Sequence, residues 1–182
     1  MPKIAITGNI ASGKSVVEDY LRTKGYVVYD ADKMVHEILD SSVSVKVAFE
    51  NYDVFDADGN ISRPKLGKLV FANSDMRKLL ESIIHPIVRK SIEDLHGDCL
   101  FVAVPLLFEA NMQDLFDKII FVSADRNLRL KRLMKRNSLT EEEALQRINA
   151  QQSEESKISK SDFVVYNNGD LNELYQQIDK IF

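Results

Sequence analysis

Five short runs of apolar and β-branched residues recur along the chain and predict the strands of a sheet. The runs are Lys3–Thr7, Tyr26–Tyr29, Leu100–Val104, Lys118–Val122 and Phe163–Tyr166. They do not alternate with polar positions, which is typical of strands buried on both faces of a parallel sheet. Helical patterns separate the runs. We therefore predict an α/β fold of three layers with a five-stranded, mainly parallel sheet.

The first helical pattern, Ser15–Lys24, ends at Gly25, and a much longer segment follows the second run. The segment Ala31–Gly97 exceeds what a simple crossover needs, and it is expected to form several helices. Ser62 and Pro64 predict the start of one helix, whose apolar positions are Leu66, Leu69, Val70 and Phe71. Ser74 is the expected cap of another helix that runs to His85 and is kinked or restarted at Pro86.

A second insertion, Asp125–Lys160, follows the fourth run. It is predicted to hold one basic helix and one capped helix. Thr140-Glu141-Glu142-Glu143 matches the capping box, in which the first and fourth side chains satisfy each other's backbone N–H groups.

Composition narrows the class of protein. The chain has 182 residues, of which 45% are hydrophobic and 29% charged, with a net charge of −4, so it offers no general attraction to nucleic acid or to an anionic membrane. Cys99 is the only cysteine, which excludes an intramolecular disulfide and suggests a buried thiol in a reducing compartment. The sequence shows no signal-peptide pattern and no apolar run of membrane-spanning length. We expect a cytoplasmic protein.

The motif that carries chemistry lies directly after the first run. Gly8-Asn9-Ile10-Ala11-Ser12-Gly13-Lys14-Ser15 fits the phosphate-loop pattern G-x-x-x-x-G-K-[ST], between a predicted strand and a predicted helix. Glycines let the backbone turn around an anion, and the helix adds unsatisfied N–H groups and its positive dipole end. Lys14 is expected to neutralise the β and γ phosphates, and the Ser15 hydroxyl to bind the accompanying Mg²⁺. The chain is predicted to bind a nucleotide.

The phosphate loop alone does not distinguish GTPases, motor ATPases and kinases. No guanine-reading N-K-x-D element appears. The third run continues Val104-Pro105-Leu106-Leu107-Phe108-Glu109, without the acidic strand end of a motor ATPase. A kinase needs an acidic residue at the end of the second strand and an arginine-rich lid, and the chain has candidates for both.

Asp30-Ala31-Asp32 follows the second run, at the sheet edge where ligands bind in open α/β folds. Two carboxylates at this spacing can act as a general base and as an indirect partner of a metal ion. The alternative is that one of them caps the following helix. Both interpretations stay open for Asp30, whereas the chemical role is favoured for Asp32.

The lid candidate is the basic helix of the second insertion. Its cations have no acidic residue between them and are Arg126, Arg129, Lys131, Arg132, Lys135 and Arg136. Arg129, Arg132 and Arg136 share one helical face, and guanidinium groups suit phosphate oxygens. The pattern favours a phosphate-facing surface. A solvated helix face explains the two lysines better, and a nucleic-acid surface lacks interleaved aromatic residues.

These elements together resemble one family, the dephospho-coenzyme A kinases. The matching segments span nearly the whole chain and are Ile6–Ser15, Asp30-Ala31-Asp32, His85-Pro86, Val104–Glu109, Arg132–Arg136 with Arg147 and Gln151, and Asp162–Gly169. The resemblance departs from the usual pattern at Asn9 and Ala11, where glycine is common, and at Val16, where threonine is common.

The resemblance implies one kinase domain over residues 1–182. Its parts would be a core (1–32, 98–124 and 161–182), a helical coenzyme A-binding insertion (33–97) and a mobile lid (125–160). It implies transfer of the γ-phosphoryl group of ATP to the ribose 3′-hydroxyl of dephospho-coenzyme A, with Mg²⁺ as cofactor and neither nucleic acid nor membrane as partner.

The site residues follow from the loop and the resemblance together. Gly8, Ala11, Ser12, Gly13, Lys14, Ser15 and Val16 are expected to bind the nucleotide, with Ser15 as metal ligand. Asp32 is the expected base, and Lys14, Arg132 and Arg136 are expected to stabilise the transferring group. His85 is a candidate for the acceptor site or only a polar residue at a kink, and Glu109 could orient the acceptor or pair with a lid arginine.

Two alternative functions stay open from sequence. One is a kinase of the same fold for another nucleoside or small alcohol. The other is a nucleotide sensor that binds ATP without turnover.

Overall fold

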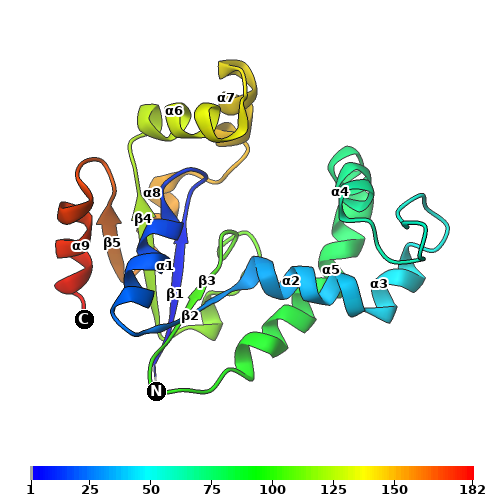
Figure 1. Cartoon of the computed structure of the whole chain (residues 1–182), viewed down its shortest axis with the longest axis horizontal. Helices are drawn as coiled ribbons and strands as arrows, with labels where there is room; N and C mark the ends of the chain where they lie inside the picture. Colours follow the sequence, from blue (N-terminus) through cyan, green and yellow to red (C-terminus); the bar gives the residue numbers. More distant parts are fainter. Residues whose placement is uncertain (1) are drawn as a thin grey trace. The chain divides into compact units, whose positions relative to one another are not determined.

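The computed structural model describes residues 2–182 and divides into two compact units (Figure 1). One unit comprises the chain up to Asp30 together with His96–Phe182. The other is Ala31–Leu95. Each unit is described by itself below.

The first unit is built on a parallel sheet in the order β2-β3-β1-β4-β5. The strands are β1 Lys3–Gly8, β2 Val27–Asp30, β3 Leu100–Ala103, β4 Lys118–Ser123 and β5 Phe163–Tyr166. All four neighbouring pairs are parallel, so the predicted fold class is confirmed. Each strand begins and ends within one residue of its predicted position, because the apolar runs coincide with the buried stretches.

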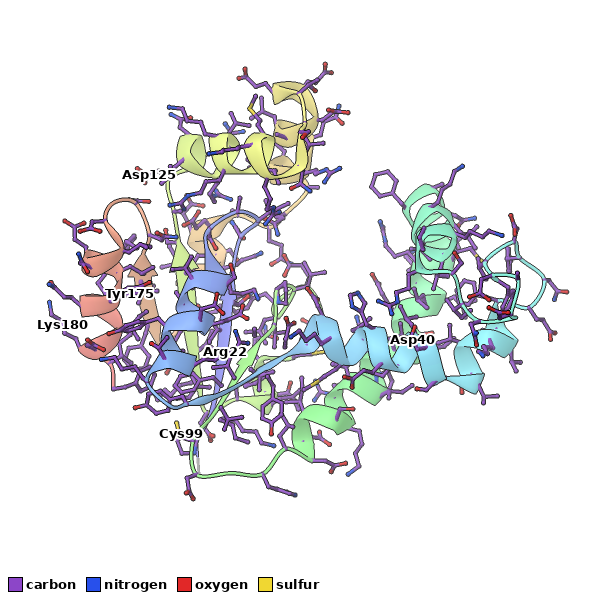
Figure 2. All side chains as sticks on the ribbon, viewed as in Figure 1. Arg22, Asp40, Cys99, Asp125, Tyr175 and Lys180 are labelled. Carbon is purple, nitrogen blue, oxygen red and sulfur yellow. The ribbon has the colours of Figure 1, made fainter. Side chains whose placement is uncertain are left out.

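Some helices lie along the sheet, and others lie beyond the carboxyl ends of its strands (Figure 1). The helical segments of this unit are α1 Lys14–Thr23, the 3₁₀ turn η1 Gln113–Leu115, α6 Arg126–Asn137, α7 Glu141–Asn149, α8 Glu154–Ile158 and α9 Leu171–Asp179. Helices α1 and α9 pack against each other, with Tyr20 and Tyr175 stacked at 3.9 Å between ring centroids. Figure 2 labels Tyr175 on α9. The apolar faces of these two helices bury Val17, Leu21 and Leu174 against the central strands, which fixes the start of α1 at the end of β1.

The second unit is helical, as predicted, and its helices are α2 Ala31–Ser41, α3 Val43–Ala48, α4 Arg63–Ala72 and α5 Ser74–Glu93. Helix α5 contacts each of the other three and buries Ile84, Val88 and Ile92. The expected helix after Ser62 is confirmed as α4, with Pro64 in its first turn, where the missing N–H costs no hydrogen bond.

Two details of α5 differ from the prediction. Its cap is Asn73, not Ser74, and the Asn73 carboxamide oxygen accepts from the N–H groups of Asp75 at 2.9 Å and Met76 at 3.2 Å. The helix also continues through Pro86 without restarting. Proline removes one hydrogen bond of the helix ladder, and burial on both sides of Pro86, at Ile84 and Val88, holds the two turns in one helix.

The predicted capping box of α7 is confirmed. The Thr140 hydroxyl accepts from the Glu143 N–H, and the Glu143 carboxylate accepts from the backbone and the hydroxyl of Thr140. The backbone hydrogen bond from Thr140 is the main cause that lowers the pKa of Glu143. Within residues 2–182, no helix combines the length and the apolar character needed to span a membrane.

Candidate active site

The loop between β1 and α1 has the backbone geometry of an anion-binding turn. Ala11 and Gly13 adopt positive φ angles of 61° and 93°, and the Ser12 N–H donates to the Asn9 carbonyl at 3.0 Å. A Cβ on Gly13 would lie 2.0 Å from the Asn167 side-chain nitrogen, so glycine is required there by space and by conformation. The loop leads directly into α1, whose first N–H groups have no partner within the helix. An anion can therefore bind at this helix start.

Side chains from distant parts of the chain hold the loop in place. Asn167, directly after β5, donates from its side chain to the Ser12 carbonyl at 2.8 Å. Gln151 accepts from the Ile10 N–H at 2.7 Å. Arg132 of α6 donates to the Ser12 carbonyl at 3.4 Å and to the Asn167 carbonyl at 3.1 Å. The structure thus brings Arg132 to the loop.

The loop lysine has an internal partner in this structure. The Lys14 ammonium donates to Oε1 of Glu18 at 2.7 Å, one turn further along α1. Glu18 is 4% exposed, and its other oxygen lies 3.5 Å from the guanidinium of Arg22, labelled in Figure 2. Lys14 thus already has an anionic partner inside the protein. The hydroxyl of Ser12 is buried without a hydrogen-bond partner among residues 2–182.

The remaining loop residues have distinct roles in the geometry. The Val16 N–H donates to the Gly13 carbonyl at 3.0 Å, which closes the first turn of α1. Ser15 is exposed at the second position of that helix. A Cβ on Gly8 would lie 2.6 Å from the Ser12 hydroxyl and from the Val122 carbonyl, so glycine is required here by close packing against β4.

The two candidate carboxylates fall in different units. Asp30 is the last residue of β2, and its register partner on β3 is Ala103, which in turn pairs with Ile6 of β1. It therefore lies at the carboxyl edge of the sheet, on the side where the phosphate loop begins. Asp32 lies in the first turn of α2 and is exposed. A carboxylate there is favoured by the helix dipole, so a structural reason for Asp32 exists beside the chemical one.

The arginines of α6 do not form one phosphate-facing surface, contrary to the sequence interpretation. Arg129 is 5% exposed, and it pairs with Glu154 at 3.1 Å and donates to the Ala124 carbonyl at 3.0 Å. It therefore points toward the protein interior. Arg136 is exposed and donates to the adjacent Asn137 side chain. Only Arg132 of the three contacts the loop.

Glu109 does not pair with a lid arginine, which was one of its two expected roles. Its Oε1 accepts from the ammonium group of Lys157 at 2.6 Å. Its Oε2 is buried and has no hydrogen-bond partner in the described part of the chain. His85 lies partly buried in α5 of the second unit.

Sequence reasoning missed several residues that shape the loop. Asn167 lies in the segment Asp162–Gly169 that carries the family resemblance, but it was given no role. Its place after a predicted strand was the signal, since the carboxyl ends of parallel strands meet at one edge. Glu18 is four residues after Lys14 on a predicted helix, a spacing at which opposite charges meet. Lys157 lies in the charged segment 154–160, and nothing local distinguishes it from a solvated lysine.

Comparison with known proteins decides the family. The family model for dephospho-CoA kinase matches residues 3–173 of the chain. The chain belongs to the dephospho-CoA kinase family. Curated members from Oceanobacillus iheyensis and Bacillus licheniformis, both named dephospho-CoA kinase, are 39% and 40% identical to it. Each alignment covers 98% of this chain and 94% of the relative.

Solved structures agree with this family. A dephospho-CoA kinase from Campylobacter jejuni is 30% identical with a TM-score of 0.74, over 98% of this chain and 94% of that one. The Thermus thermophilus protein TT1252 is 33% identical with a TM-score of 0.84, over 99% and 95% of the two chains. A shikimate kinase from Bacteroides thetaiotaomicron shares the fold at 11% identity, with a TM-score of 0.61. The family and its phosphotransferase class are thus established for this chain.

Proposed function

We propose that this chain transfers the γ-phosphoryl group of ATP to the 3′-hydroxyl of dephospho-coenzyme A, which yields ADP and coenzyme A, the final step of coenzyme A synthesis. The supporting observation is a phosphate loop held by a lid arginine, Arg132, in a member of the dephospho-CoA kinase family. The resemblance of the Asp30-Ala31-Asp32 segment to that family supports the choice of acceptor.

The phosphate loop is the proposed binding site of the phosphoryl donor, ATP. We propose that backbone N–H groups of Ala11–Val16 and the ammonium of Lys14 hold the β and γ phosphates, with Gly8 and Gly13 providing room for the turn. Phosphate would replace Glu18 as the partner of Lys14. Because the leaving ADP oxygen gains charge during transfer, an ammonium group held at the β–γ bridge stabilises the transition state more than the ground state.

The metal-binding role is assigned to Ser15. Its hydroxyl is on an exposed residue in the first turn of α1, next to Lys14, and a hard oxygen ligand of this kind suits Mg²⁺. Magnesium, when bound, would neutralise negative charge on the phosphate oxygens. The protein's own contribution at this point is to supply that hydroxyl at the start of the helix.

Binding and activation of the acceptor, dephospho-coenzyme A, are assigned to Asp32 and to the helical insertion 33–97. We propose that Asp32 orients the 3′-hydroxyl and accepts its proton, and that the insertion binds the coenzyme A moiety. Residues 1–32, 98–124 and 161–182 would form the catalytic core. The proposed location of this reaction is the cytoplasm, with dephospho-coenzyme A as partner and neither nucleic acid nor membrane.

The segment 125–160 is proposed to act as a lid whose arginines meet phosphate when both substrates are bound. Arg132 already contacts the loop, whereas Arg136, one turn further on, is exposed and must move to reach it. Amide hydrogen exchange across Leu128–Gln151 should therefore slow when ATP and acceptor, or an analogue that joins both, are added. Closure also excludes water and so limits ATP hydrolysis.

Helix α9 provides the internal control for this exchange experiment, because it packs against α1 and carries none of the proposed site residues. Its exchange should stay unchanged. If the phosphate loop becomes protected while Leu128–Gln151 does not, α6 carries a solvated basic face and the lid proposal is wrong.

A panel of acceptors tests the proposed reaction against its alternatives. ADP release from Mg-ATP should depend on dephospho-coenzyme A and stay near the no-acceptor rate with adenosine, other nucleosides and small alcohols. A preferred acceptor of another class would indicate a different kinase of this fold. Tight ATP binding without single-turnover transfer to any acceptor would indicate a nucleotide sensor.

A further inference from the structure

A buried lysine in the proposed lid segment 125–160, so far without an assigned role, connects the phosphate loop to the rest of the protein. Lys157, on the short helix α8, is 1% exposed. Its ammonium donates to the side-chain oxygen of Asn9 at 2.8 Å and to Oε1 of Glu109 at 2.6 Å. Asn9 is the second residue of the phosphate loop and is 6% exposed. One cation thus joins the loop, the segment after β3, and α8.

Stability alone explains this cluster poorly. Lysine is almost never fully buried, because removing its charge from water is costly, and an apolar pair of similar size is often equally stable. The cluster is also incompletely satisfied, since Oε2 of Glu109 has no donor within residues 2–182. A costly arrangement of this kind beside a phosphate loop is better explained by the position it imposes on the loop.

On the side of Asn9, the phosphate loop borders a cavity and is held by polar contacts. Asn9 lines a polar cavity of about 580 Å³, whose other lining residues include Arg129, Gln151 and Glu154. Two polar contacts hold the loop there: Lys157 on the Asn9 side chain and Gln151 on the Ile10 N–H. The next side chains, Ile10 and Ala11, pack against the apolar cluster of α6 and α7. Asn9 in turn accepts the Ser12 N–H through its carbonyl, so moving Asn9 moves the turn.

Helix α8 is itself held by contacts with α6 and with the end of β4. Its first residue, Glu154, pairs with Arg129 of α6 and accepts from the Ser123 hydroxyl at the end of β4. The Ser153 hydroxyl caps it by accepting from the Ser156 N–H. Lys157 therefore contacts the loop from a helix that both β4 and α6 hold in place.

We propose that Lys157 is a positioning residue for phosphoryl transfer: acting through Asn9, it holds the phosphate loop in the conformation that binds ATP. Lys157 does not touch the nucleotide in this account. The proposal rests on the proposed function only in that ATP is the ligand of the loop, and its test reads ATP binding without any acceptor.

The test compares Lys157→Met/Glu109→Gln with the wild-type chain, because Glu109→Gln alone would leave the Lys157 ammonium buried without a counter-ion. Removing both charges together avoids leaving the Glu109 carboxylate buried without a counter-ion, so the double variant is expected to fold. Binding of a non-hydrolysable ATP analogue with Mg²⁺ is measured by calorimetry, and thermal unfolding reports stability. The double variant should bind the analogue about tenfold or more weakly than the wild type, since small misplacements of positioned groups have large effects.

Asn9→Ala, added to both proteins, tests the route of the effect. If Lys157 acts through Asn9, its substitution should cost less than about twofold once the Asn9 carboxamide is gone, because coupled residues are not additive. Equal analogue affinity with and without Lys157 overturns the proposal. So does a loss of the same size in the presence and absence of the carboxamide.

The binding measurements can be interpreted whatever the acceptor is, because no acceptor is present in them. A wild-type chain that binds the analogue but does not phosphorylate dephospho-coenzyme A contradicts the proposed function and leaves the Lys157 comparison intact. A merely structural role would lower the unfolding temperature without changing the affinity of the folded protein.

Discussion

Lys14→Ala is expected to reduce turnover by about a hundredfold or more while ATP affinity falls much less. The ammonium of Lys14 stabilises charge that develops at the β–γ bridge during transfer, whereas ground-state binding is shared with many backbone N–H groups of the loop. Steady-state kcat and the Kd for ATP, measured on the same preparation, check this expectation.

The ion pair with Glu18 requires a control. Removing Lys14 leaves a buried carboxylate whose remaining cationic partner within residues 2–182 is Arg22 at 3.5 Å, and an unbalanced buried charge distorts or destabilises the helix that carries it. Lys14→Ala/Glu18→Gln removes both charges, and we expect it to be as inactive as Lys14→Ala. Recovery of activity in the double variant, or near-normal turnover in Lys14→Ala, would contradict the assigned role of the lysine.

Asp32→Asn is expected to reduce phosphoryl transfer by roughly 10²–10⁴, the usual range for the loss of a positioned acid or base. Asparagine keeps the shape but removes the proton acceptor and one negative charge. ATP binding should change little, because the loop and the lid hold the γ-phosphate in this account. Single-turnover rates and ATP titrations separate the two effects.

Asp30→Asn is the matched comparison, since Asp30 lies two residues earlier at the end of β2. Its effect should be milder if Asp30 supports the turn or a metal-bound water. If Asp30→Asn abolishes transfer while Asp32→Asn keeps most of it, the base has been assigned to the wrong carboxylate.

The strands could be predicted from sequence because the pattern that identifies each one, a continuous apolar run, lies within the strand itself. A strand buried on both faces of a parallel sheet must be apolar along its whole length, and Leu100–Ala103 and Lys118–Ser123 show this directly. The phosphate loop could be predicted for the same reason, because the residues of its motif, with their glycines, lysine and serine, are consecutive in sequence and themselves form the turn. The capping box of α7 is also local, confined to Thr140–Glu143.

Helix ends and the direction of charged side chains were harder to predict. Asn73 and Ser74 are adjacent and both cap helices well, so sequence could not decide between them. Periodicity placed Arg129 and Arg132 on one side of α6, but the partner that draws Arg129 inward is Glu154, on another helix. Lys157 is buried only because Asn9 and Glu109 converge on it, and such convergence is a property of the fold.

The most direct test of the account is to identify the product of one reaction. Purified protein is incubated with Mg-ATP and dephospho-coenzyme A, and the products are separated. Mass spectrometry gives their masses, and phosphorus NMR gives the position of the new phosphate group. We expect ADP and coenzyme A in equal amounts, with the new phosphate on the ribose 3′-oxygen. ADP without coenzyme A, or a phosphate at another position, would contradict the assigned reaction.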